Sequence, residues 1–262
     1  MIIEASFDPV TVEMVQAIRN LMKQEGIHEV YVQPCNEGIL SVEQRVRLLR
    51  LAFASYRHIH VTKGKKADRI LTGYEENEKL ARSGYFRLVP ASVRRDLIEN
   101  NLYLPQIVEA QCSPRRAIHS KGVADTCVIL ARAHHLDEKL AERMGYLHDV
   151  TKAMSDEEGE AVLRIWSPSD LSLNPKIWHS RTAVFWLKHN MGLYDPKVLI
   201  PIWNHTLGQG KSDYDRILYI ADKIEPNRNY DTTYHLSLAK KDLRKAVDLV
   251  MKEGEEYRRK GN

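Results

Sequence analysis

Short runs of β-branched and aromatic side chains alternate with longer runs of helical periodicity through the first hundred residues. Strands are expected at 2–5, 29–33 and 58–62, and helices at 10–25 and 42–54. Strand–helix–strand alternation at this spacing is typical of βαβ units and predicts a parallel sheet. A basic loop at 63–69 follows, and the segment 85–89 leads through Pro90 into a further helix at 91–100.

The pattern changes near residue 104, after which helical runs follow one another without a convincing strand. Prolines mark most of the boundaries between these runs. We therefore predict an α/β domain at 1–105 and an all-α bundle at 106–262. The helices expected in the second domain are 114–135, 137–152, 155–165, 176–191, 196–205, 212–224 and 236–260.

Composition narrows the class of protein only a little. The chain has 262 residues, 43% hydrophobic and 28% charged, with a net charge of +4, which suits an anionic small molecule. Nucleic acid is not expected, because binders usually carry a concentrated basic stripe. No apolar run approaches the length of a membrane span, and the N-terminus lacks signal-peptide features, so no membrane is expected. Three cysteines without C-x-x-C spacing predict neither disulfides nor a zinc ribbon, and favour the cytoplasm.

Histidines and carboxylates recur through the helical half at the spacing of a metal site. Imidazole and carboxylate are ligand types for borderline divalent metals such as iron, manganese or zinc. Six such ligands are more than one tetrahedral ion needs, so the set indicates two metals and a metal-dependent phosphohydrolase. The predicted ligands are His119, His148, Asp149, His179, His205 and Asp222.

The sequence around these residues supports a metal site more strongly than the His148-Asp149 dipeptide does by itself. His148 and Asp149 follow an apolar helical segment, where titratable side chains are costly to bury without a partner. Lys152 projects from the same face, and Arg116 lies three residues before His119. A cation beside metal ligands is suited to contact phosphate. Asp222 lies in an apolar stretch, where an aspartate is seldom buried unless it is paired or bound to metal.

The helical half resembles a known family through three segments. Residues 116–126 (RAIHSKGVADT) and 147–152 (LHDVTK) look like the opening motifs of HD-domain phosphohydrolases. HTLG at 205–208, followed by RILYIADKIEPNR at 216–228, resembles the signature of the YqeK-type HD proteins, which are bacterial symmetrical diadenosine tetraphosphate hydrolases. Leu207, Gln209 and Asn227 depart from that signature at positions that concern substrate handling.

The resemblance implies a di-iron centre that cleaves diadenosine tetraphosphate into two ADP through a metal-bound hydroxide. The six ligands above would hold the metals, with Asp149 bridging them. Arg116 and Lys152 would offset charge on the phosphoryl oxygens, and Asp149 would complete the catalytic set. The residues implied to bind substrate are Thr206, Gly208 and Arg228. Manganese and zinc are the alternative metals, since such sites follow metal availability.

The first half resembles nicotinate-nucleotide adenylyltransferases but lacks the motif residues that carry out their reaction. ASFDP at 5–9, YVQP at 31–34, SVEQR at 41–45 and LVPASVRRDLIENNLY at 88–103 follow the order of that family. Thr11, Val12, Glu13 and Met14 occupy the positions of its HxGH motif, and a carboxylate there is electrostatically wrong for ATP. We therefore expect a degenerate nucleotidyltransferase domain with a Rossmann-like parallel sheet.

Two other functions stay open from the sequence. The same di-metal site could act on another nucleotide, such as a nucleoside triphosphate or an alarmone. Alternatively, both domains could bind nucleotides without reaction, as in a sensing protein, although no ligand of the set is missing. The expected partner is a small dinucleoside polyphosphate. The sequence leaves the oligomeric state open, with a homodimer as one arrangement.

Overall fold

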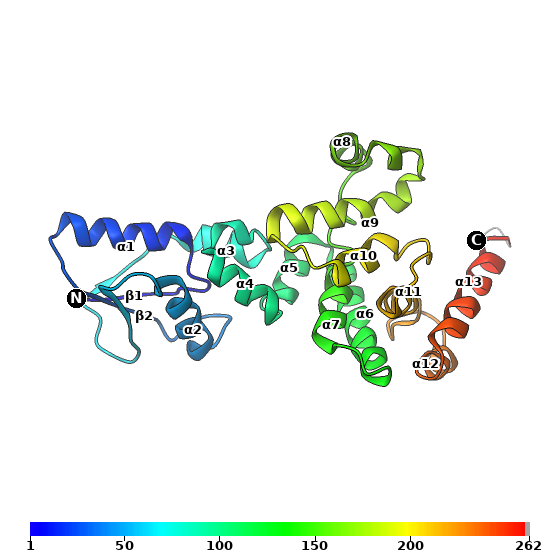
Figure 1. The fold of residues 1–262 in the computed structure, drawn as a ribbon, viewed down its shortest axis with the longest axis horizontal. Coiled ribbons are helices and arrows are strands. Elements are labelled where there is room, and N and C mark those ends of the chain that lie inside the picture. The colour runs from blue at the N-terminus through cyan, green and yellow to red at the C-terminus, as the bar shows by residue number, and fades with distance from the viewer. Residues whose placement is uncertain (260–262) are drawn as a thin grey trace. The chain divides into compact units, whose positions relative to one another are not determined.

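The computed structural model describes residues 1–259 and divides into two compact units. The first contains Met1–Tyr103 together with Asn190–Gly192, and the second contains Leu104–His189 and the chain from Leu193 onward. The first unit is an α/β fold and helices dominate the second, so the predicted fold classes are confirmed (Figure 1).

A parallel sheet of four strands forms the centre of the first unit. The strand order is β3-β2-β1-β4, from β1 (Ile2–Ala5), β2 (Val30–Pro34), β3 (Ile59–Val61) and β4 (Arg69–Ile70). All three pairings are parallel, as the alternation predicts. Ile3, Val30 and Val32 are fully buried in this sheet. The two-residue strand β4 begins at the last residue of the predicted basic loop and is not predicted, because two residues carry no strand periodicity.

Helix starts in the first unit follow from capping side chains. Thr11 accepts a hydrogen bond from the backbone of Met14 at the start of α1 (Val12–Gln24). Ser41 and Gln44 form a capping box at the start of α2 (Val42–Phe53). The unit also contains α3 (Glu75–Arg82), which is not predicted, a 3₁₀ turn at Phe86–Leu88, and α4 (Ala91–Glu99).

The loop after β1 has its polar groups satisfied by the protein itself. The Ser6 hydroxyl donates to the Glu78 carboxylate at 2.6 Å, and the Asp8 backbone N–H donates to it at 2.8 Å. Asp8 in turn accepts from the backbone of Ile39 at 2.5 Å and from the Tyr103 hydroxyl. Glu78 and Asp8 are both 2% exposed. The hydrogen-bond donors just after β1 are therefore already bonded to a carboxylate, at the end of the sheet where this fold class ordinarily binds phosphate. This agrees with a degenerate site.

Helices α5 to α13 make up the second unit (Figure 1). Most start near a Ser, Asn or Asp cap or a proline. Their bounds are α5 Leu104–Gln111, α6 Pro114–Ala133, α7 Glu138–Leu147, α8 Asp156–Trp166, α9 Pro175–Trp186, α10 Pro196–Asn204, α11 Asp213–Ile224, α12 Thr233–Ala239 and α13 Leu243–Arg259.

Helix α5 is not predicted from the sequence, and the structure differs from the predicted helices at three further places. Helix α7 ends at Leu147, so His148 and Asp149 lie at and just beyond its end. Helix α9 continues as a π-helical turn at Leu187–Met191. The single helix predicted at 236–260 is wrong: α12 ends at Ala239 and Asp242 caps α13 by accepting from the backbone of Arg244 and Lys245. The last predicted residue, Lys260, lies outside the described residues.

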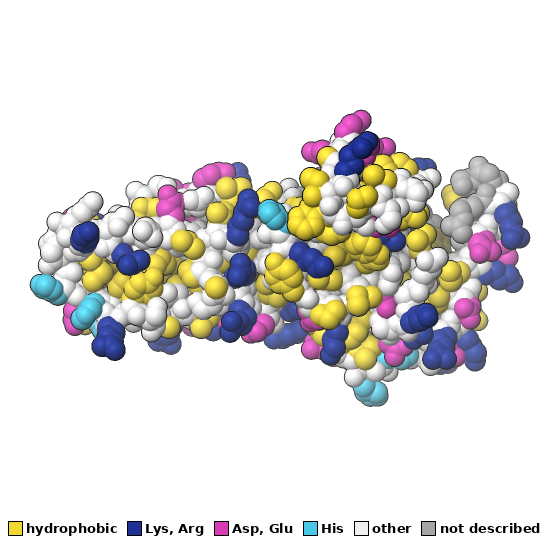
Figure 2. Space-filling view, turned by 45° about the horizontal axis from the view of Figure 1, so that its top comes forward, with side chains coloured by type: hydrophobic (Ala, Val, Ile, Leu, Met, Phe, Trp, Pro, Cys, Tyr) yellow, Lys and Arg dark blue, Asp and Glu magenta, His cyan; other side chains and the backbone are white. Residues whose placement is uncertain are grey.

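Within residues 1–259, no helix combines the length and apolar character needed to span a membrane. On the face drawn in Figure 2, Lys and Arg side chains are scattered and do not gather into one stripe. All three cysteines are free, as predicted.

Helices α6 and α7 approach closely at Gly145, three residues before His148. A Cβ atom on Gly145 would lie 2.5 Å from the Cα atom of Ala124 in α6, which is inside van der Waals contact. We therefore expect Gly145→Ala to separate these helices and to lower the free energy of unfolding by about 1–3 kcal/mol, as measured by urea denaturation. The matched control is Gly254→Ala in α13, where a Cβ atom meets nothing within 4 Å. That change should stabilise the helix by about 0.5–1 kcal/mol, and equal effects of both changes would contradict this account.

Candidate metal centre

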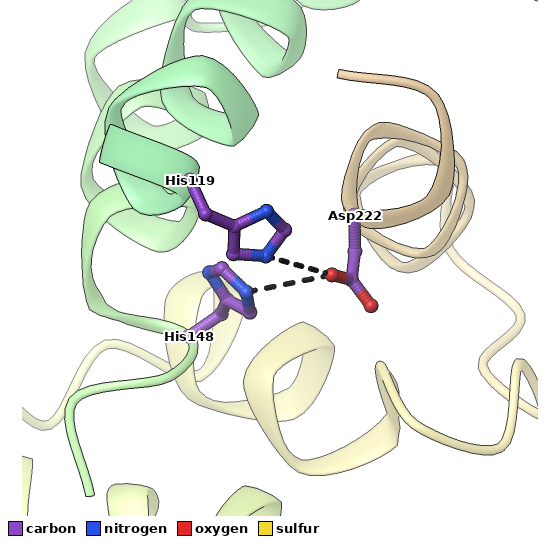
Figure 3. A group of neighbouring side chains, drawn as sticks. All are labelled: His119, His148 and Asp222. Atoms are coloured by element: carbon purple, nitrogen blue, oxygen red, sulfur yellow. Dashed lines mark hydrogen bonds and ion pairs between the residues drawn. The ribbon is translucent and has the colours of Figure 1, made fainter. Parts of the chain in front are cut away.

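One group of potential ligands joins α6, the end of α7 and α11. His119 lies on α6, His148 is the residue after α7, and Asp222 lies on the last turns of α11. Figure 3 shows both imidazoles directed at the same carboxylate oxygen of Asp222. The Nε2 atoms of His119 and His148 lie 3.1 and 3.7 Å from Asp222 Oδ1. These three side chains are buried and their ligand atoms lie within 4.8 Å of one another.

A second group shares His148 with the first. It adds Asp149, and His205 from the end of α10. The Nε2 atoms of His148 and His205 lie 3.5 and 3.7 Å from the Asp149 carboxylate. His179 of α9 reaches the same carboxylate, with Nε2 3.2 Å from Oδ1. The structure thus brings all six predicted ligands together in two overlapping groups.

The hydrogen bonds of the imidazoles favour metal binding. Nδ1 of His148 donates to the carbonyl oxygen of Gly145 at 2.7 Å, and Nδ1 of His205 donates to that of Ile202 at 2.6 Å. Each bond fixes the tautomer that leaves a lone pair on Nε2, as in metal-binding histidines. Nε2 of His148 is buried and has no hydrogen-bond partner among the described residues. A buried ring nitrogen without a hydrogen-bond partner, between two carboxylates, fits a position at which a divalent cation would replace a proton.

Charge in the site is arranged around the two aspartates. Burial alone would raise the pKa of Asp149, but His148, His179 and His205 hold it well below its usual range. Burial likewise opposes ionisation of Asp222, yet Lys223, His119 and His148 lower its pKa well below the usual value. Burial lowers the pKa of His148, and the two aspartates overcome this and raise it to about 10. Burial lowers the pKa of His205 to about 4. The site therefore holds two anionic carboxylates that attract a cation.

Glu225 is a site residue that the sequence analysis did not assign. Its carboxylate lies 3.2 Å from Nδ1 of His119 and accepts a 2.8 Å hydrogen bond from the backbone N–H of Asn227. Glu225 is only 2% exposed, and a Cβ atom at Gly122 would lie 2.4 Å from its Oε2 atom. A carboxylate behind a histidine orients the ring and increases its basicity. The available signal was the spacing of three residues after Asp222 on the same helical face.

Replacing Glu225 should weaken metal binding without removing a ligand. Without the carboxylate on Nδ1, the His119 ring loses its fixed orientation, so we expect Glu225→Ala to reduce metal affinity by about 10- to 100-fold. Glu225→Gln keeps the volume and should have the smaller effect. Competition with a metal-sensitive chelator measures the affinity. Glu138→Ala is the control, because Glu138 pairs with Arg132 on the surface; unchanged affinity in Glu225→Ala would rule out the orienting role.

The residues predicted to contact phosphate lie in different surroundings. Arg116 donates to Asp149 Oδ2 at 2.7 Å, and Arg228 lies 3.3 Å from Asp222 Oδ1. Together with Thr206 and His119 they line a cavity of about 1350 Å³. Lys152 lies 2.8 Å from Nδ1 of His179, and neither it nor Gly208 is among the described residues that line this cavity.

Gly208 has a structural reason to be glycine. Its φ angle is +65°, and a Cβ atom there would lie 2.8 Å from the ring of Tyr219. No contact in the structure tests the predicted roles of Lys152 and Gly208 toward substrate, so these roles stay predictions. The same holds for Arg116, Thr206 and Arg228.

Comparison with known proteins agrees with this geometry. Residues 116–227 match the HD domain family. The chain is 34% identical over 175 residues to the "Probable nicotinate-nucleotide adenylyltransferase/Ap4A hydrolase" of Mycoplasma pneumoniae. This match covers 64% of this chain and 51% of that protein. The match thus spans about half the length of this relative. The chain is also 33% identical over 144 residues to the "Bis(5'-nucleosyl)-tetraphosphatase, symmetrical" of Bacillus subtilis, covering 53% of this chain and 77% of that enzyme.

A solved structure supports the same assignment. The predicted HD superfamily hydrolase involved in NAD metabolism from Clostridium acetobutylicum superposes with a TM-score of 0.54 at 28% identity, over 59% of this chain and 84% of that one. HD domains bind divalent metals, and the two buried groups supply suitable ligands. The chain therefore belongs to the HD-domain hydrolase family that includes the symmetrical bis(5'-nucleosyl)-tetraphosphatases.

Proposed function

We propose that the helical unit hydrolyses diadenosine tetraphosphate symmetrically to two ADP, using a dinuclear metal centre. The observation that carries the proposal is the pair of buried ligand groups that share His148. One group includes His119, which also lines a cavity with Arg116 and Arg228. Ligands for two cations beside guanidinium groups suit a polyanionic phosphate ester.

The donor set fits divalent iron, with manganese or zinc as alternatives. His119, His148 and Asp222 would hold one ion, while Asp149, His205 and His179 would hold the other, with His148 and Asp149 at the centre of the set. When bound, the ions would polarise phosphoryl oxygens and lower the pKa of a water nucleophile toward neutrality. Lys152 lies 2.8 Å from Nδ1 of His179, so its side chain would help to orient this ring toward the metal site.

The protein's own groups would orient the phosphate chain and offset its charge. Arg116 is held by Asp149 with its side chain 35% exposed, so its remaining N–H groups are available to phosphoryl oxygens. Arg228, held by Asp222, offers a second guanidinium in the same cavity. Attack of water on the second or third phosphorus breaks the central P–O–P bridge. The bridging oxygen leaves with the departing nucleoside diphosphate and takes up a proton, so both products are ADP.

Comparison of substrates tests this assignment against the alternatives. The full chain, purified without oxygen and loaded with iron or manganese, should cleave diadenosine tetraphosphate with a kcat/KM at least about tenfold above that for ATP or guanosine tetraphosphate. A higher kcat/KM for ATP or guanosine tetraphosphate would show that the site serves another nucleotide. Binding without turnover of any of them would indicate a sensing protein.

A further inference from the structure

The cavity beside the metal ligands has walls of different character. One wall comes from α6 and α11 and includes Arg116, His119 and Lys223. The other wall comes from α13, where Val250, Met251 and Tyr257 line the cavity together with the acidic Glu253 and Glu255. Helix α13 packs against α11 and α12 within the same unit (Figure 1). A polyphosphate accounts for the cationic wall but gives no reason for the apolar and aromatic side chains of the other wall.

Two tyrosines present their rings to this space. Tyr230, in the segment between α11 and α12, is 53% exposed, and Tyr257 on α13 is 61% exposed; both line the cavity. The Tyr230 hydroxyl donates to the backbone carbonyl of Lys223, which fixes its ring beside the cationic wall. Aromatic rings exposed inside a cavity, and not scattered on the surface, are characteristic of a binding site.

These tyrosines lie beyond the HD domain match, which ends at residue 227. The HD match contains the six predicted metal ligands and Arg116, and Arg228 follows it directly, so the later segment that carries the tyrosines adds something separate to the site. The volume of about 1350 Å³ exceeds the roughly 300–1000 Å³ of ordinary small-molecule pockets. That volume leaves space for a nucleoside in addition to the phosphate chain.

We infer that Tyr257 and Tyr230 form a nucleoside-binding wall, on which a base of the substrate stacks while its phosphates face Arg116 and Arg228. The inference rests on the proposed function, since it takes the nucleoside to be that of the hydrolysed nucleotide. Stacking on aromatic side chains is sequence-tolerant, because every base has a π-face. The wall therefore determines binding of nucleosides as a class.

Binding of ADP and of pyrophosphate separates this role from a structural one. Calorimetry with the full chain, loaded with the divalent ion, gives the Kd of each probe. Replacement of Tyr257 by Ala should weaken ADP by about tenfold and change the Kd of pyrophosphate by less than twofold. Tyr257→Phe should retain ADP binding, because it keeps the ring. Tyr194→Ala is the control, since Tyr194 is 69% exposed and lies outside the residues that line the cavity.

Several outcomes would overturn the inference. Equal loss of ADP and pyrophosphate would make Tyr257 a general support of the site, and unchanged ADP binding in both Tyr257→Ala and Tyr230→Ala would remove the wall altogether. The measurement is independent of turnover. If ADP binding depends on Tyr257 but the wild-type chain fails to cleave diadenosine tetraphosphate, only the proposed function fails. If cleavage occurs and replacement of the tyrosines leaves ADP binding unchanged, only this inference fails.

Discussion

Replacement of Asp149 by Ala is expected to remove bound metal and hydrolysis together while the helical unit stays folded. Asp149 lies within 3.2 to 3.7 Å of the Nε2 atoms of three histidines and is 3% exposed. Without this carboxylate the site loses the anion nearest all three rings. Metal-ion catalysis supplies several kcal/mol of transition-state stabilisation, so kcat/KM should fall by about 10³-fold or more.

Metal content per chain and kcat/KM are the two measurements for this variant, with circular dichroism as the test of folding. Asp125→Ala is a matched control on α6, because Asp125 is exposed and pairs only with Lys121 among the interactions found in the described residues. The control should keep both metal and activity. Full activity in Asp149→Ala would show that the metal centre lies elsewhere.

Arg116→Ala should lower the rate but keep the metal. Arg116 contacts Asp149 through one N–H group and lines the cavity, yet it offers no lone pair to a cation. Loss of one preorganised donor for the transition state costs about 10²- to 10³-fold in kcat. Metal analysis should give the wild-type content, and this separates Arg116 from the ligands.

Two further variants sharpen this test. Arg116→Lys retains the charge without the planar fork and should recover only part of the rate. Arg132→Ala removes an arginine from the other end of α6, where it pairs with Glu138 on the surface, and should behave as the wild type. If Arg116→Ala keeps its kcat, the guanidinium does not stabilise the transition state.

The clustering of the predicted ligands could be expected from the local sequence around each of them. Asp222 interrupts an apolar stretch of α11, and His148 follows an apolar helix, so each is a polar group where burial is costly without a partner. Residue types alone could also indicate a metal, since imidazole and carboxylate are its ordinary ligands. The structure brings these residues within the distances that such a site requires.

Other features of the site depend on contacts between segments distant in sequence, which no local sequence pattern predicts. Glu225 acquires its place behind His119 only because Gly122 leaves room for its carboxylate. Lys152 projects from the predicted face but meets His179, which comes from α9 and is distant in sequence. In the first unit, the missing motifs indicate a degenerate site, while the filling of its loop by Glu78 depends on α3, which was not predicted.

The break between α12 and α13 has a different origin. Residues 236–260 keep helical periodicity throughout, so the pattern favours one helix. Asp242 competes by accepting from two backbone N–H groups and starts a new helix at Leu243. This break sets the direction of the helix that carries Tyr257, and the inferred nucleoside-binding wall depends on it.

Symmetrical cleavage by the metal-loaded chain is the central claim, and hydrolysis of diadenosine tetraphosphate in water enriched in heavy oxygen tests it most directly. We expect ADP as the only nucleotide product, with one heavy oxygen on the terminal phosphate of one of the two ADP molecules formed. Chelation of the metal should abolish the reaction, and added iron or manganese should restore it. Formation of ATP and AMP, or undiminished cleavage by the metal-free protein, would contradict the account.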